Sequence, residues 1–159
     1  MPKNVVRQIS NAGRRAQSAK NRQPWHFIAI QDCQTMEALS SLGTFAGHLA
    51  DAALVVAILT PDATQHRSIM FDAGQAAAHT QLAAWELGVG SCLATIYQPE
   101  LARTLLGFPD DLHLNFAISS GFPCESDILT SAPKAGGRRS LHGTVHFDCW
   151  GHPYDHTCD

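Results

Sequence analysis

One uninterrupted apolar run constrains the fold more than any other part of the sequence. Residues 53–60 read Ala-Leu-Val-Val-Ala-Ile-Leu-Thr, and Pro61 and Asp62 then end the run. The segment is rich in branched side chains and lacks polar alternation, which is typical of a strand covered on both faces. It is far shorter than the roughly 20 apolar residues that cross a bilayer. We therefore expect a central strand whose sheet carries helices on both sides.

The other periodic segments indicate helices and strands in irregular order. Apolar residues spaced three or four apart predict an N-terminal helix with the stripe Val5, Ile9, Ala12 and Ala16. Further helices are expected over residues 35–46, 65–87 and 99–106, and further strands over residues 25–30, 91–97 and 112–120. Because these elements do not repeat as βαβ units, we expect an α+β fold with a mostly antiparallel central sheet flanked by helices.

Residues 65–87 form the longest helical pattern and are rich in alanine and glycine. Small side chains let a second helix approach closely, so we expect this helix in the core and also at a dimer interface. Charged residues make up 16% of the chain, below the usual share of about 25%. That shortage also indicates surface hidden in an oligomer.

Length and composition favour one domain over residues 1–159, since 45% of the residues are hydrophobic and can form one good core. Residues 124–159 combine loop-forming residues with a polar, aromatic and histidine-rich end. We expect them to form a loop and an extended tail that packs on the partner subunit.

Charge and cysteine content narrow the partners and the compartment. The formal charge of −3 and the lack of a long basic run argue against a nucleic-acid partner. No segment is long and apolar enough for a membrane span, and nothing near Met1 has the pattern of a signal peptide. The five cysteines are odd in number and scattered, which favours reduced thiols in the cytoplasm.

A polar loop lies between the first helix and the first strand. Small and amide side chains fill it, namely Ser18, Ala19, Asn21 and Gln23. Gln23 precedes a proline, which favours an extended backbone at that residue. Such side chains let amide groups approach a flat polar ligand.

The segment Ala16-Gln17-Ser18-Ala19-Lys20-Asn21-Arg22-Gln23-Pro24-Trp25-His26-Phe27 resembles the signature A-P-S-x-x-N-x-Q-P-W-x-F of nitroreductase-like flavoproteins. Downstream, Asp72-Ala73-Gly74 and residues 83–92 are similar to that family's D-x-G and LAA-x-x-LGLGSC segments. Residues 105–109, 117–123 and 137–141 resemble its later motifs, and His146 stands where its tail often has a histidine. Each motif alone is weak, but their shared order and spacing make the resemblance specific.

The resemblance implies an intertwined homodimer with flavin mononucleotide (FMN) bound at the subunit interface. The implied activity passes electrons from NADH or NADPH to a small acceptor such as a nitroaromatic or a quinone, in two half-reactions on the flavin. Because a flavin carries the hydride chemistry itself, no protein side chain is expected to be catalytic. The protein must hold the phosphate, bind the ring edge and leave one ring face open.

The resemblance also implies particular cofactor contacts. Ser18 and Asn21 match the family's loop positions at the ring, and an asparagine can both donate to and accept from its pyrimidine edge. Backbone N–H groups near Thr95 and Ile96 fall where the family places a donor to the reactive nitrogen. A guanidinium fork suits the phosphate. The predicted cofactor-binding residues are Arg14, Arg15, Gln17, Ser18, Ala19, Asn21, Thr95, Ile96, Arg138 and Arg139.

The chain departs from the family pattern in ways that leave alternatives open. The basic motif R-R-S-x-R, which grips the phosphate in most members, is absent from the sequence. Either the start of the sequence is truncated, or Arg14, Arg15 or Arg22 substitutes for the motif, or flavin binds weakly. A further alternative is a degenerate member that keeps the dimer fold and binds flavin or another ligand without turnover. Gln17 replaces the usual proline, and Ile96 brings a bulky side chain close to the ring.

Two further alternatives concern single residues. Ser18 and Asn21 are also residue types that cap turns, and Asp72 suits a structural hydrogen bond better than acid catalysis.

The tail carries metal-ligand residue types at short spacing, in the order His146, Cys149, His152, His156 and Cys158. The spacing matches no zinc pattern that we can name. We therefore expect no metal, and a tail that is solvated or packed at an interface.

Overall fold

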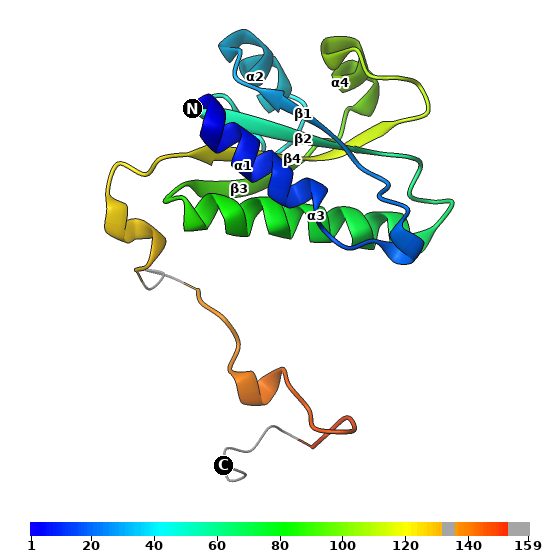
Figure 1. The fold of residues 1–159 in the computed structure, drawn as a ribbon, viewed down its shortest axis with the longest axis vertical. Coiled ribbons are helices and arrows are strands. Elements are labelled where there is room, and N and C mark those ends of the chain that lie inside the picture. Colours follow the sequence, from blue (N-terminus) through cyan, green and yellow to red (C-terminus); the bar gives the residue numbers. More distant parts are fainter. Residues whose placement is uncertain (132–135, 153–159) are drawn as a thin grey trace. The chain divides into compact units, whose positions relative to one another are not determined.

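The computed structural model describes residues 1–131 and 136–152. The chain divides into two units, Met1–Leu129 and the residues from Thr130 onward, and each is described by itself. In the first unit a sheet carries α1 and α3 on one face and α2 and α4 on the other (Figure 1). This arrangement confirms the predicted α+β class.

The sheet is four-stranded and antiparallel at every pairing, with the strand order β1-β2-β4-β3. The strands are β1 (His26–Ile30), β2 (Leu54–Thr60), β3 (Gly90–Thr95) and β4 (His113–Gly121). All seven residues of β2 are buried, as the apolar run predicts. β1 and β3 are the edges of the sheet.

The helices are α1 (Lys3–Arg14), α2 (Cys33–Ser40), α3 (Arg67–Glu86) and α4 (Pro99–Leu106). Short 3-10 turns lie at Ala19–Asn21, Gly47–Leu49, Ser126–Leu129 and Leu141–Gly143. α3 and α4 match their predicted ranges closely. Gly88 (φ 70°) and Gly107 (φ 68°) follow them in the left-handed conformation that ends many helices.

The prediction of one helix over residues 35–46 is wrong in both boundaries. α2 starts earlier because the Asp32 carboxylate accepts a 2.8 Å hydrogen bond from the Thr35 N–H and so caps the helix. It ends earlier because the hydroxyls of Ser40 and Ser41 donate 2.7 Å hydrogen bonds to backbone carbonyls of the last turn. Such bonds compete with continuation of the helix.

Small residues let α1 and α3 touch at backbone distance. A Cβ atom on Gly13 would lie 2.4 Å from the Thr80 hydroxyl oxygen. That hydroxyl is fully buried and donates to the Ala76 carbonyl oxygen at 2.8 Å. The missing side chain of Gly13 therefore allows this intrachain contact with Ala76 and Thr80 of α3.

The two faces of the sheet bury separate cores. On one face, Met36 and Leu39 of α2 and Ala102 of α4 cover apolar side chains of the sheet. On the other, the alanines of α3 meet Ile58 and Ile118. Two helical layers on one sheet account for the complete burial of β2.

The prediction of one domain over residues 1–159, with residues 124–159 packed on a partner, stays a prediction. No helix within residues 1–131 and 136–152 is long and apolar enough to span a membrane.

Candidate functional site

The loop between α1 and β1 has a backbone conformation that residues other than glycine rarely adopt. Lys20, Asn21 and Gln23 have φ angles of 55°, 54° and 50°. The expectation of an extended Gln23 before Pro24 is therefore wrong. Left-handed residues of this kind cost about 1–3 kcal/mol each and cluster at ligand sites. Three of them within four positions mark the loop as a candidate site.

Asp72 of α3 anchors this loop by hydrogen bonds to its backbone. The Ala19 N–H donates to both of its carboxylate oxygens at 3.1 Å. The Asp72 side chain is only 3% exposed, so this contact largely satisfies a buried charge. Asp72 is thus a structural hydrogen-bond acceptor, as the sequence indicates.

Ser18 and Asn21 accept hydrogen bonds from Gln23 within the same loop. The Gln23 N–H donates to the Ser18 hydroxyl oxygen at 2.9 Å, and the Gln23 side-chain amide donates to the Asn21 Oδ1 at 3.1 Å. Both residues therefore have the turn-stabilising role that was one alternative. The two bonds use acceptors only, so the Ser18 hydroxyl proton and the Asn21 NH₂ group are donors that a ligand can use.

The two predicted donors at the end of β3 differ in direction. The Ile96 N–H donates to the Asn115 carbonyl oxygen at 2.9 Å, so it is already bonded within the protein. Thr95 stands opposite Phe116, and adjacent positions of an antiparallel ladder alternate in direction. The Thr95 N–H therefore faces away from β4, on the side where the backbone of Gly43 approaches the Thr95 carbonyl oxygen.

The Ile96 side chain is 4% exposed and lies in the core beneath α2 and α4. It is thus turned into the protein. A pocket at the edge of β3 that faces away from β4 would not be narrowed by it.

The strand register fixes how the loop and Thr95 are related. His26, the first residue of β1, pairs with Leu59 near the end of β2. Ile58, the neighbour of Leu59, pairs with Phe116 of β4, and Phe116 pairs with Thr95, the last residue of β3. The loop before β1 and the end of β3 thus lie at the same end of the sheet. They lie at opposite edges, three strand spacings or about 14 Å apart.

Four basic residues lie in or beside this loop, namely Arg14, Arg15, Lys20 and Arg22. The first 31 residues hold six Lys or Arg and no Asp or Glu, while the rest of the chain holds five Lys or Arg against fourteen Asp or Glu. Arg14 is exposed, and its guanidinium donates to the Asn11 Oδ1 at 2.8 and 3.2 Å. Arg15 and Gln17 are exposed beside it. This end of the first unit therefore favours an anion.

Arg138 and Arg139 belong to the second unit and are exposed. Their predicted contact with a phosphate stays a prediction, because the two units are not placed relative to each other.

The described part of the tail contains His146, Cys149 and His152, whereas His156 and Cys158 lie outside the described residues. Among the residues that the structure describes, no three His, Cys, Asp or Glu side chains gather as a metal site would require. The His146 ring instead packs on Trp150, with ring centroids 4.2 Å apart.

Comparison with known proteins decides the family. A family model described as the nitroreductase family matches residues 1–44 and 34–122. A protein of Archaeoglobus fulgidus, provisionally named NADH dehydrogenase/NAD(P)H nitroreductase, is 33% identical over 125 residues, which is 74% of this chain and 72% of that protein. The chain belongs to the nitroreductase family. The predicted resemblance is thereby confirmed.

Solved structures agree with this assignment. An FMN-dependent nitroreductase from Clostridium difficile R20291 is 26% identical, with a TM-score of 0.79 over 94% of this chain and 90% of that one. A Parabacteroides distasonis protein with the same provisional name as the archaeal relative is 21% identical, with a TM-score of 0.79 over 94% and 88% of the two chains. The nitroreductase fold predicted from the sequence is thereby confirmed.

Sequence reasoning missed how Asp72 and Gln23 cooperate in shaping the loop of this nitroreductase-family chain. One signal was present: an aspartate within an alanine-rich helix is a candidate for a buried polar contact. Its partner, however, lies 53 positions away in the sequence, and no local pattern identifies it.

Proposed function

We propose that this chain is an FMN-dependent oxidoreductase that takes electrons from NADH or NADPH and passes them to a small acceptor, such as a nitroaromatic or a quinone. The observation that carries the proposal is the strained loop, held by Asp72, in which Ser18 and Asn21 retain free donors. Family membership supports it. So does the likeness to a protein named as an FMN-dependent nitroreductase.

In this proposal each group of residues has a separate task. Asn21 and Ser18 donate to the oxygen and nitrogen atoms of the ring edge. The outward Thr95 N–H suits the ring nitrogen that accepts hydride. Arg14 and Arg15, together with Arg138 and Arg139, supply positive charge for the phosphate. When bound, the flavin supplies the hydride chemistry, and the protein supplies binding and orientation.

We further propose a homodimer formed through α3. Five residues of this helix recur three or four apart along its exposed face: Phe71, Gly74, Ala78, Leu82 and Trp85. The three large ones are 72%, 64% and 52% exposed. Apolar side chains this exposed in a continuous stripe are typical of an interface. A two-fold axis would pair the stripe with its own copy.

A dimer also suits the placement of the predicted contacts. The loop and Thr95 of one protomer lie at opposite edges of its sheet. A second copy could bring its own loop toward the Thr95 edge, so that each flavin contacts both subunits.

A cytoplasmic location completes the proposal. The cysteines of the described residues, namely Cys33, Cys92, Cys124 and Cys149, are all unpaired thiols. Unpaired exposed thiols are usual in a reducing compartment.

The colour of the purified protein tests the proposed function. We expect a yellow protein whose flavin absorbance bleaches when NADH or NADPH is added without oxygen, and recovers when a nitroaromatic or a quinone follows. Colourless protein that ignores added FMN would remove the enzyme proposal. Yellow protein that neither donor bleaches would favour the alternative, a degenerate member that binds flavin without turnover.

Substitutions test the residue assignments. Asn21→Ala, and the double change Arg138→Ala with Arg139→Ala, should each raise the dissociation constant of FMN about tenfold, since each removes a hydrogen bond worth roughly 1–2 kcal/mol. Glu37→Ala, at an exposed position of α2, is the control. Unchanged FMN affinity in both variants would refute these assignments.

A further inference from the structure

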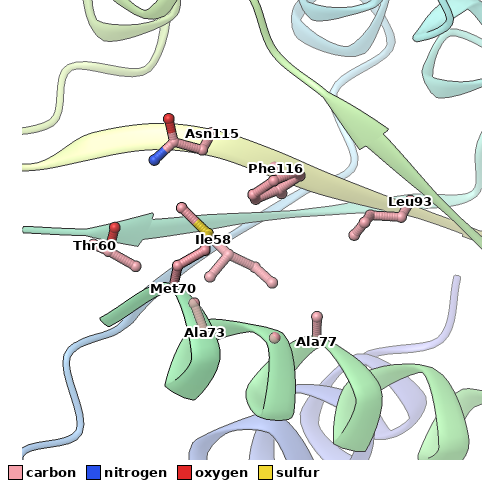
Figure 2. Close-up of a pocket in the computed structure, with 9 residues that line it drawn as sticks. Ile58, Thr60, Met70, Ala73, Ala77, Leu93, Asn115 and Phe116 are labelled. Carbon is pink, nitrogen blue, oxygen red and sulfur yellow. The ribbon is translucent and has the colours of Figure 1, made fainter. Parts of the chain in front are cut away.

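A concave feature lies between the first half of α3 and the sheet (Figure 2). It is an apolar cavity of about 190 Å³. Met70, Ala73 and Ala77 line it from α3, and Leu93 and Phe116 line it from the sheet. Gly74 of α3 lines it as well, so three of the four helical positions carry small residues and leave space beside Met70, Leu93 and Phe116.

The size of the cavity points to one class of ligand. An apolar cavity of about 150 Å³ in an engineered protein stays dry and binds benzene. The cavity here is about 190 Å³, which leaves room for a single aromatic ring with one small substituent. No ionisable side chain is among its lining residues, so a neutral molecule is favoured over a charged one.

The buried hydroxyl of Thr60 is one polar group in the wall of the cavity. Thr60 lines it, is only 3% exposed, and its hydroxyl oxygen has no hydrogen-bond partner among the described residues. Buried polar groups without partners are rare in native proteins, and each calls for a reason. A ligand with one hydrogen-bonding group would provide that partner.

The sheet is locally distorted in a way that adds a second polar side chain. Ile58 pairs with Phe116 but the next residue, Leu59, pairs with Leu114. Asn115 is therefore the extra residue of a β-bulge, a feature that re-aims side chains and is frequent beside binding sites. Asn115 consequently lines the same cavity as Thr60 (Figure 2).

We propose that this cavity binds a neutral monocyclic aromatic molecule carrying one hydrogen-bonding substituent. The ring lies among the α3 alanines and Phe116, and the substituent pairs with the Thr60 hydroxyl. Binding involves no redox step, so it can be measured on the protein without flavin.

Methionine methyl signals give a direct test, with phenol as the probe. The chain has three methionines. Met70 lines the cavity, whereas Met36 is 2% exposed in the core on the opposite face of the sheet. In protein labelled at the methionine methyl carbons, phenol should shift the Met70 signal saturably and leave the Met36 signal in place. No saturable shift at millimolar phenol, or equal shifts of both signals, would overturn the proposal.

Two variants test the cavity itself. Ala77→Leu fills the space and should abolish the phenol-induced shift of Met70. Ala38→Leu, the same change at an exposed position of α2, should leave it intact. Binding that survives Ala77→Leu in a folded protein would place phenol elsewhere and refute the site.

Thr60→Val removes the hydroxyl at nearly constant shape and keeps the test decisive if Ala77→Leu fails to fold. Phenol should then bind about tenfold more weakly, as expected for one lost hydrogen bond, while the affinity for benzene stays unchanged. Equal losses for phenol and benzene would show that Thr60 only shapes the cavity and would refute its pairing with the ligand.

Discussion

Replacing Asp72 with alanine should separate the stability of the fold from the shape of the candidate site. The Ala19 N–H donates to both carboxylate oxygens at 3.1 Å, and hydrogen bonds to charged groups contribute about 1.5–3 kcal/mol. The three left-handed residues of the loop store about 1–3 kcal/mol each. The strain is therefore at least comparable with the bond that helps to hold it.

Without Asp72 the loop can relax, and the relief of strain offsets most of the lost bonding. We therefore expect Asp72→Ala to lower the free energy of unfolding by less than about 1 kcal/mol. FMN would then have to restore the strained loop, at a cost of about 2 kcal/mol, so its dissociation constant should rise about 30-fold.

Three measurements check this reasoning: urea unfolding for stability, quenching of FMN fluorescence for affinity, and hydrogen exchange at the Ala19 amide. The exchange should become faster whether or not FMN binds, so the loop can be judged independently of the proposed function. Asp72→Asn keeps an acceptor oxygen and should change FMN affinity only a few-fold. Asp51→Ala, which removes an exposed carboxylate, should change nothing.

Two results would refute the argument. Ala19 exchange in Asp72→Ala that matches the unsubstituted protein would show that Asp72 does not hold the loop. A loss of stability well above 3 kcal/mol would show that the contact supports the whole fold and stores no local strain.

Three further predictions concern the fold and its assembly. Trp85→Glu adds one charge from each subunit to the proposed two-fold interface, so sedimentation should show monomers. An unchanged dimer would show that the interface does not involve this face of α3. Gly13→Ala forces a Cβ to within 2.4 Å of a hydroxyl on α3 and should cost about 1–3 kcal/mol in urea unfolding, whereas Gly47→Ala, with nothing within 4 Å of its Cβ, should cost far less. The pKa of Asp32 is lowered first by the hydrogen bond from the Thr35 hydroxyl and then by that from the Thr35 N–H. The cap that Asp32 forms on α2 should therefore persist above the ordinary carboxylate pKa and be lost as the pH falls through the lower folded value. The NMR signal of the Thr35 amide should report this loss, and Asp32→Asn should remove the pH dependence.

Several elements were predictable because their causes are local. The apolar run of β2 identifies a strand buried on both faces, and Pro99 and Gly107 bracket α4 by their fixed backbone preferences. The α2 boundaries were missed although their causes are also local: the Asp32 cap and the two serine hydroxyls compete with the apolar periodicity. Apolar periodicity alone does not reveal these hydrogen bonds.

The sequence predicts residues for the candidate site, and these stay a prediction, whereas the geometry of the loop could not be predicted. The motif around Ser18 and Asn21 identifies the loop, and with it the family. The left-handed angles at Lys20 and Gln23 could not be read from these residue types, because neither is a glycine or an asparagine. They persist because bonds from elsewhere in the fold maintain them.

The sequence by itself determined the family, the antiparallel α+β class and the position of the candidate loop, since these follow from local patterns and ordered motifs. Only the tertiary structure decided that Asp72 holds the loop, that Thr95 and not Ile96 directs its N–H away from β4, and that a bulge turns Asn115 toward the cavity beside Thr60. The physical reason in each case lies beyond the local sequence. The first depends on contact between segments far apart in the sequence, and the other two depend on strand register, where a shift of one residue would reverse the direction of the groups concerned.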